Sequence, residues 1–148
     1  MLNEHQANPE GFFGNAFLAD DLFYGSSPET LDSLLAVKQT KQFAENELIF
    51  SSGQMPCCIY FLIKGEAQII YNAVFVRPVK RAEILGLTEA ITDLPYEITV
   101  KAVSPCRFEC IGREDFIRFL QNEPGTCFRL LQMLGANLQK VYQLFANQ

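Results

Sequence analysis

The sequence predicts a mainly β protein with flanking helices, formed by a single domain of 148 residues. Between residues 38 and 112, apolar and polar residues alternate with a period of two in short runs separated by Gly, Pro and Asn turns. Helical spacing occurs near residues 28–37 and again from residue 113 onward. Strands therefore fill the middle of the chain, and helices flank them.

Composition and charge indicate a globular protein without a basic face. Apolar residues make up 49% of the chain, and its formal net charge is -5. Nucleic-acid binding would lack its main electrostatic contribution, so we expect no direct DNA binding by this chain. No run approaches the roughly 20 apolar residues of a membrane span. The N-terminal MLNEHQANPEG has no targeting features, so we expect a cytoplasmic protein with no membrane contact.

The first elements alternate between irregular and helical segments. Residues 1–27 are predicted to be an irregular, aromatic-rich segment with a short helix near residues 15–21. A helix is predicted to start with Ser27 as N-cap and Pro28 at its first position, and to end by Val37.

Seven strands are predicted next, with a central one at residues 57–65 that stops at Gly65. Pro78 marks an edge strand or a bulge. The turn near Asn72 lacks Asn-Gly or Asp-Gly, which leaves its geometry open. The strand segments are KQTKQF, LIFSSGQ, CCIYFLIKG, EAQIIYN, VFVRPVKRAE, YEITVKAV and CRFECIG.

The stretch from Glu83 to Ala102 has the layout of a phosphate cradle. A short apolar strand, Ile84 and Leu85, runs into Gly86 and then into the helical turn LTEAI, before the strand that starts at Tyr96. A glycine between a strand and a helix start lets the backbone approach a ligand and directs free N–H groups at an anion.

Two helices are predicted after the last strand, and the second has two apolar faces. The helix from Arg113 ends before Pro124, and Phe128, Leu130 and Met133 of the next helix are expected to pack on the strands. The opposite face is a heptad seam, so the helix is expected to have two packing partners. In one interpretation both faces are buried within one monomer, and in the other the seam packs on a second copy of the chain to form a homodimer. The seam residues are Cys127, Leu131, Leu134, Leu138, Val141 and Phe145.

The order of these elements resembles the cyclic-nucleotide-binding-like domain of the Crp-Fnr family of transcription regulators. The resemblance lies in residues 47–72, in the cradle and in residues 100–124 with the helix that follows. It implies an antiparallel β-roll, a jelly-roll-like double-stranded β-helix, with a short N-terminal helix, a cassette helix and a long C-terminal dimerisation helix. The implied division is an N-terminal segment at 1–27, the roll at 28–123 and the dimerisation helix at 124–148.

The resemblance also implies a ligand site, of which key positions are changed. Nucleotide binders of this family hold the ribose with a Glu after the cassette Gly, and neutralise the phosphate with an Arg at the next strand. Without a gap, Gly86 stands in the Glu position, and only a shifted register would bring in Glu83 or Glu89. Tyr96 stands in the Arg position, and the next residue, Glu97, would repel a phosphate. We therefore expect no ordinary cyclic AMP binding and no cofactor, which leaves an unidentified small-molecule ligand open. The candidate residues are Gly86, Leu87, Thr88, Glu89, Tyr96 and Glu97, and Val141 and Tyr142 stand where family members contact the base.

Catalytic and metal chemistry finds little support in the sequence. The single histidine, His5, lies in a polar tail, so we expect no metal site and no enzyme. The five cysteines are read as reduced core thiols. Cys57 and Cys58 are expected to point to opposite faces of one strand, and Cys106 and Cys110 to share a face about 13 Å apart.

Three hypotheses for function remain. The first is the signal-sensing domain of a Crp-Fnr-like regulator with a degenerate pocket, whose DNA-binding domain is either left out of this chain or naturally absent. The second is a stand-alone dimerisation or interaction module whose pocket is filled by Tyr96 and by N-terminal Phe residues. The exposure of Tyr96 discriminates between these two, because a buried tyrosine favours the second. The third is a thiol redox sensor, with Cys127 facing its twin across the dimer.

Overall fold

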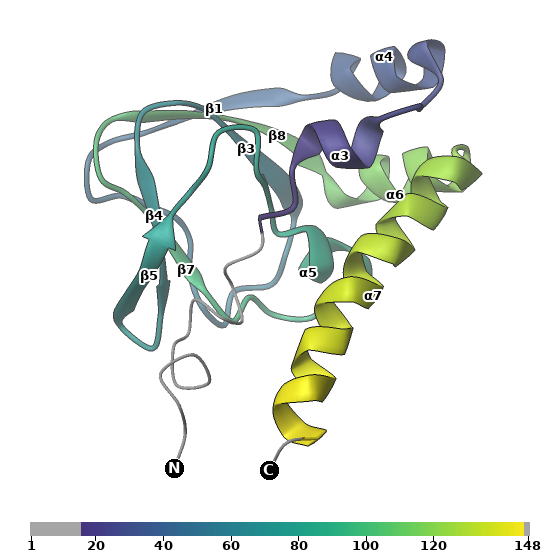
Figure 1. Cartoon of the computed structure of the whole chain (residues 1–148). Helices are drawn as coiled ribbons and strands as arrows, with labels where there is room; N and C mark the ends of the chain where they lie inside the picture. The colour runs from purple at the N-terminus through teal and green to yellow at the C-terminus, as the bar shows by residue number, and fades with distance from the viewer. Residues whose placement is uncertain (1–15, 147–148) are drawn as a thin grey trace.

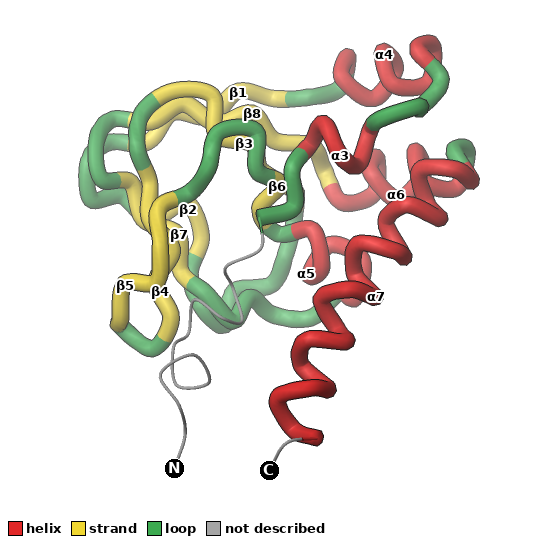
Figure 2. Tube along the Cα trace, in the orientation of Figure 1, coloured by secondary structure: helices red, strands yellow, loops and turns green. Residues whose placement is uncertain are grey.

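The computed structural model describes residues 16–146, with side chains described as far as Gly135. Two four-stranded antiparallel sheets form a β-roll, and helices α3, α4, α6 and α7 gather on one side of it (Figures 1 and 2). One sheet has the order β1-β8-β3-β6 and the other the order β2-β7-β4-β5. The strands are β1 (Gln39–Phe43), β2 (Leu48–Phe50), β3 (Cys58–Lys64), β4 (Ala67–Tyr71), β5 (Val74–Pro78), β6 (Ile84–Leu85), β7 (Thr99–Ala102) and β8 (Cys106–Gly112).

The helices follow the predicted order. The short helix expected near residues 15–21 lies slightly later, and Leu22 on it is buried. Ser27 precedes the next helix as predicted, but its hydroxyl donates to the carboxylate of Glu29 instead of capping a backbone N–H. The helices are α3 (Ala19–Phe23), α4 (Pro28–Ala36), α5 (Leu87–Thr92), α6 (Arg113–Gln121) and α7 (Pro124–Ala146).

Two hydrophobic clusters share the strands β3 and β8. On β3, Tyr60 belongs to the cluster inside the roll, whereas its neighbour Ile59 belongs to the cluster beneath the helices. Phe108 and Ile111 divide β8 in the same way. Successive side chains of a strand point to opposite faces, so a strand buried on both faces becomes continuously apolar. This arrangement confirms the predicted central strand, which as β3 spans Cys58–Lys64 within the predicted 57–65.

The β4–β5 connection is a tight two-residue hairpin. Asn72 and Ala73 both have positive φ, at 51° and 63°, between Tyr71 and Val74. Positive φ at both central residues is the feature of a type I′ turn, which matches the twist of the paired strands. Pro78 ends β5, the edge strand of its sheet, as the sequence predicts.

Helix α7 presents its apolar residues differently from the prediction. Leu130 is buried and Met133 packs against the helix-side cluster, but Phe128 is 62% exposed, so its predicted packing on the strands is wrong. Phe128 lies on the same face as Leu131, which is also 62% exposed. Leu134, expected in the seam, packs partly against the chain's own cluster. The side chains of Leu138, Val141 and Phe145 lie outside the described residues.

Within residues 16–146, none of the helices combines the length and apolar character that crossing a bilayer would require.

Candidate functional site

The predicted strand, glycine and helix of the cassette are present at residues 84–92. Gly86 links β6 to α5 with φ at 81°, in the left-handed region that favours glycine. A Cβ at Gly86 would lie 3.2 Å from Cε1 of Tyr96, so the tyrosine ring lies directly against the turn. The site that the sequence marks as a cradle is therefore in contact with its own Tyr96.

Tyr96 is a core residue, only 2% exposed. Its ring stacks on Phe50 with centroids 3.9 Å apart and planes at 17°. Its hydroxyl donates to the backbone oxygen of Cys58 at 3.4 Å. Burial raises the pKa of Tyr96 above its ordinary value, so the side chain stays a neutral phenol.

The backbone around Tyr96 differs from the predicted strand. The prediction starts the strand at Tyr96, but β7 begins at Thr99. Tyr96 instead exchanges backbone hydrogen bonds with the 53–54 loop, donating to Gln54 at 3.0 Å and accepting from Gly53 at 2.8 Å. These two bonds hold the tyrosine between β2 and the end of the cassette.

The remaining candidate residues, Leu87, Thr88, Glu89 and Glu97, include two carboxylates and no cation. Leu87 is buried, and Thr88 and Glu97 are exposed. Burial, reinforced by the nearby charge of Glu97, raises the pKa of the half-buried Glu89. A cluster of carboxylates beside the cassette opposes the binding of an anion.

Arg113 is a residue near the cassette that the sequence analysis treated only as a helix start. Its Nε donates to the backbone oxygen of Ala90 on α5 at 2.7 Å and lies 3.8 Å from the carboxylate of Asp93. Its own N–H donates to the backbone oxygen of Cys57 at 2.9 Å. Arg113 therefore connects the cassette helix, the start of α6 and the start of β3.

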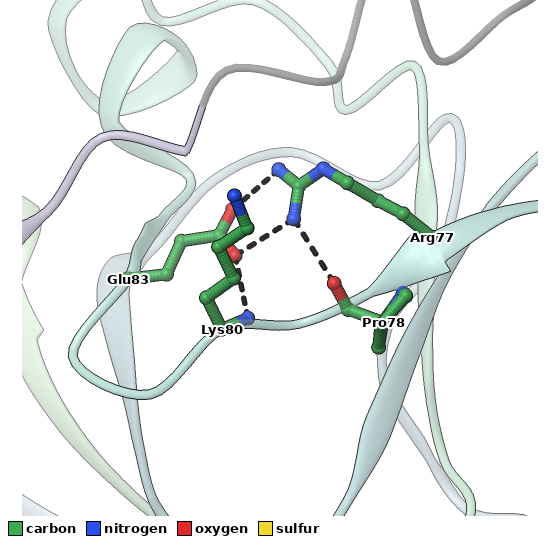
Figure 3. A network of polar contacts seen from close by, with 4 residues as sticks. All are labelled: Arg77, Pro78, Lys80 and Glu83. Atoms are coloured by element: carbon green, nitrogen blue, oxygen red, sulfur yellow. Dashed lines mark hydrogen bonds and ion pairs between the residues drawn. The ribbon is translucent and has the colours of Figure 1, made fainter.

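A buried ion pair next to the start of the cassette was also not predicted from the sequence (Figure 3). The guanidinium of Arg77 contacts both carboxylate oxygens of Glu83, at 2.9 and 2.7 Å, and also donates to the backbone oxygen of Pro78. Glu83 also accepts from the N–H of Lys80 at 2.9 Å, and it is 3% exposed. Two opposite charges within otherwise apolar runs, VFVRP and EIL, were the available signal.

The thiols Cys57 and Cys58 are closer than predicted. Their Sγ atoms lie 3.4 Å apart, so the expectation of opposite faces is wrong. The reason is that β3 begins at Cys58, so the alternation of a strand does not extend back to Cys57. Cys58, Cys106 and Cys110 are buried, Cys57 is exposed, and Cys127 is half-buried.

In the part of the chain that the structure describes, no group of three His, Cys, Asp or Glu side chains could hold a metal ion. The candidate site thus consists of a short helix, α5, that follows Gly86 in the left-handed conformation. The ring of Tyr96 lies against this glycine, and the carboxylates of Glu89 and Glu97 are the charged groups among the candidate residues.

Comparison with known proteins identifies the family to which this chain is similar. The model of the cyclic nucleotide-binding domain matches residues 40–123. The cGMP-dependent protein kinase of Eimeria tenella is 26% identical over 133 residues, which make up 89% of this chain and 13% of the kinase. The chain thus spans only a small part of that relative's length.

Two solved structures share the fold. The sensor domain of the transcriptional regulator DNR from Pseudomonas aeruginosa is 24% identical with a TM-score of 0.71, over 80% of this chain and 87% of that one. The Catabolite Activator Protein of Thermus thermophilus is 18% identical with a TM-score of 0.72, over 85% of this chain and 62% of that one. Because the family match includes every strand of the roll except the first residue of β1, the chain belongs to the cyclic nucleotide-binding domain family and has the fold of the Crp-Fnr sensor domains.

Proposed function

We propose that this chain is a regulatory domain of the cyclic nucleotide-binding family whose phosphate position is closed by its own Tyr96. It binds neither cyclic AMP nor cyclic GMP and acts through self-association of helix α7. The observation that carries the proposal is the 2% exposure of Tyr96, together with its stacking on Phe50 at 3.9 Å.

The chemistry of the filled site supports this proposal. A cyclic phosphate taken out of water needs a bidentate cation or several free N–H donors. Tyr96 offers a neutral hydroxyl that already donates to Cys58, and its ring lies against Gly86. The side chains of Glu89 and Glu97 add negative charge near the same position.

Helix α7 provides the proposed route for output. Leu130 anchors the helix in the helix-side cluster, while Phe128 and Leu131 remain 62% exposed on another face. A helix that packs on its own domain and also presents apolar residues outward can join two copies. A change in packing at the cassette would alter the angle of α7 by a population shift and so change how two copies associate.

Thermal unfolding with millimolar cyclic AMP or cyclic GMP tests the closed site. A ligand that binds only the folded state raises the unfolding midpoint by mass action, and we expect no shift with either nucleotide. Tyr96→Phe, which keeps the ring and removes one 3.4 Å hydrogen bond, should behave identically. A rise of several degrees in the wild-type chain would show that the site is open, and the proposal would then fail.

The burial of Tyr96 favours the interaction module over a pocket that takes an unidentified ligand. The thiol redox alternative depends on a different feature, the pairing of Cys127 with its twin across a dimer, and Cys127 is half-buried in the single chain.

A further inference from the structure

Cys57 and Cys58 form a pair in which one thiol faces solvent and the other does not. Cys57 is exposed, Cys58 is 5% exposed, and their sulfur atoms lie 3.4 Å apart. An exposed thiol next to a second thiol is the arrangement in which a first oxidised sulfur is captured by a neighbour.

Both residues of the pair are tied to other elements by their backbone oxygens. The oxygen of Cys57 accepts from the N–H of Arg113 at 2.9 Å, and the oxygen of Cys58 accepts from the hydroxyl of Tyr96 at 3.4 Å. Arg113 also reaches the cassette helix through Ala90 at 2.7 Å. A change in the Cys57–Cys58 peptide would therefore disturb the hydrogen bonds that connect it to Tyr96, to α5 and to the start of α6.

We propose that Cys57 and Cys58 are a vicinal dithiol site that peroxide oxidises reversibly to a disulfide between adjacent residues, loosening the bonds that hold Tyr96 and Arg113. This inference concerns the start of β3 and the residue before it, and it does not depend on whether the nucleotide position is closed.

The reaction proceeds in two steps. The thiolate of Cys57 attacks one oxygen of hydrogen peroxide, an S–O bond forms as the O–O bond breaks, and the departing hydroxide takes up a proton to become water. The sulfur of Cys58 then attacks the sulfur of Cys57, the S–O bond breaks, and the second oxygen leaves as water with the proton of the Cys58 thiol. Two electrons pass from the two thiols to the peroxide, which is reduced to two waters.

Burial sets the order of the two steps. It raises the pKa of Cys58 to about 12, so Cys58 remains a thiol at neutral pH and Cys57 reacts first.

Ring closure requires the backbone to move. The disulfide closes a ring that contains the Cys57–Cys58 peptide, and the sulfurs must approach from 3.4 Å to about 2.05 Å. Since the oxygen of Cys57 belongs to this peptide, its bond from Arg113 is the first to be disturbed.

Mass spectrometry of the full chain after hydrogen peroxide treatment tests the proposal. We expect the non-reduced peptide that contains both cysteines to lose two hydrogen atoms, and dithiothreitol to restore them. Amide hydrogen exchange at Arg113, whose N–H donates to the backbone oxygen of Cys57, should be faster in the oxidised chain. The Cys57→Ser substitution, at an exposed position, should abolish this loss of two hydrogen atoms. The Cys127→Ser variant should still show it.

Three results would overturn the proposal. These are oxygen addition at Cys57 while Cys58 stays free, a disulfide-linked pair of chains in place of the internal bond, and unchanged oxidation in Cys57→Ser. Each leaves the nucleotide experiment unaffected, because that experiment measures ligand binding to the reduced chain.

Discussion

Ala73 is an L-residue in a conformation that suits glycine. Its φ of 63° places it in the left-handed region, where a Cβ costs about 1–2 kcal/mol. The type I′ turn imposes this angle, because the β4–β5 hairpin allows only two residues, Asn72 and Ala73, between its strands.

Ala73→Gly should therefore stabilise the fold. The relief of strain exceeds the added flexibility of the unfolded chain, and we expect a gain of about 0.5–1 kcal/mol in the free energy of unfolding. Urea denaturation measures it as a higher midpoint. Ala44→Gly is the control, since Ala44 is also exposed in a turn but lacks a positive φ. Equal effects of the two substitutions would contradict the prediction.

Glu89 makes stability depend on pH. Burial raises its folded-state pKa above the ordinary value of 4.5, so the folded chain holds the proton more tightly than the unfolded chain. The resulting stabilisation is fully present below pH 4.5 and is lost as the pH rises through the folded-state pKa. At neutral pH, ionised Glu89 therefore carries a cost that a neutral side chain would not.

Glu89→Gln should raise the free energy of unfolding at pH 7 relative to the wild type, and this gain should disappear toward about pH 4, where Glu89 is protonated. Urea denaturation across this pH range measures the difference. Glu114→Gln is matched, because Glu114 also lies in the first turn of a helix but is exposed. A gain for Glu89→Gln that is independent of pH would show that ionisation is not its cause.

At the scale of elements, the ion pair of Arg77 and Glu83 fixes where the cassette begins. It joins the end of β5 to the residue that precedes β6, across a loop that includes Lys80. Both side chains are nearly inaccessible, at 6% and 4% exposure. Removing one partner from a buried pair is costly, because the remaining charge stays in a medium of low polarity.

Glu83→Ala should lower the free energy of unfolding by about 3–5 kcal/mol. Chemical denaturation of the purified variant provides the measurement. Glu109→Ala gives a matched comparison, because Glu109 pairs with the partly exposed Lys38 at 3.3 Å and should contribute less than about 1 kcal/mol. Similar losses in the two variants would mean that burial does not distinguish the pairs.

Helices and strands could be predicted from the sequence wherever a local residue pattern was enough to specify them. Pro78 indicated the edge strand, Gly86 indicated the strand-to-helix turn, and the apolar run before Gly65 indicated a strand buried on both faces. The burial of Tyr96 and the contact of Cys57 with Cys58 could not be read in this way. Both depend on where a strand begins, and a shift of one to three residues changes which face a side chain occupies.

At the scale of the whole molecule, α7 determines the proposed assembly. Phe128 and Leu131 are three positions apart, so they lie on one helical face, and both are 62% exposed. Leu134 is partly covered by the chain's own helix-side cluster. Self-association through this helix should therefore depend on Leu131 more than on Leu134.

Leu131→Asp should weaken self-association at least tenfold, or about 1.4 kcal/mol, because it places a charge in an apolar contact. Sedimentation velocity over a range of protein concentrations measures the change. Ser33→Asp introduces the same charge at an exposed residue of another helix, α4, and should associate like the wild type. A wild-type chain that stays monomeric at tens of micromolar would rule out the α7 dimer.

The shared strands β3 and β8 have a consequence for how the molecule comes apart. Ile59 and Tyr60 are adjacent in the chain but support different hydrophobic clusters, and Phe108 and Ile111 repeat this on the neighbouring strand. Loss of either cluster exposes one face of β3 and β8, and the other face of these strands supports the remaining cluster. The roll and its helices therefore form a single cooperative folding unit, in which damage on one side reduces the lifetime of the native state on both.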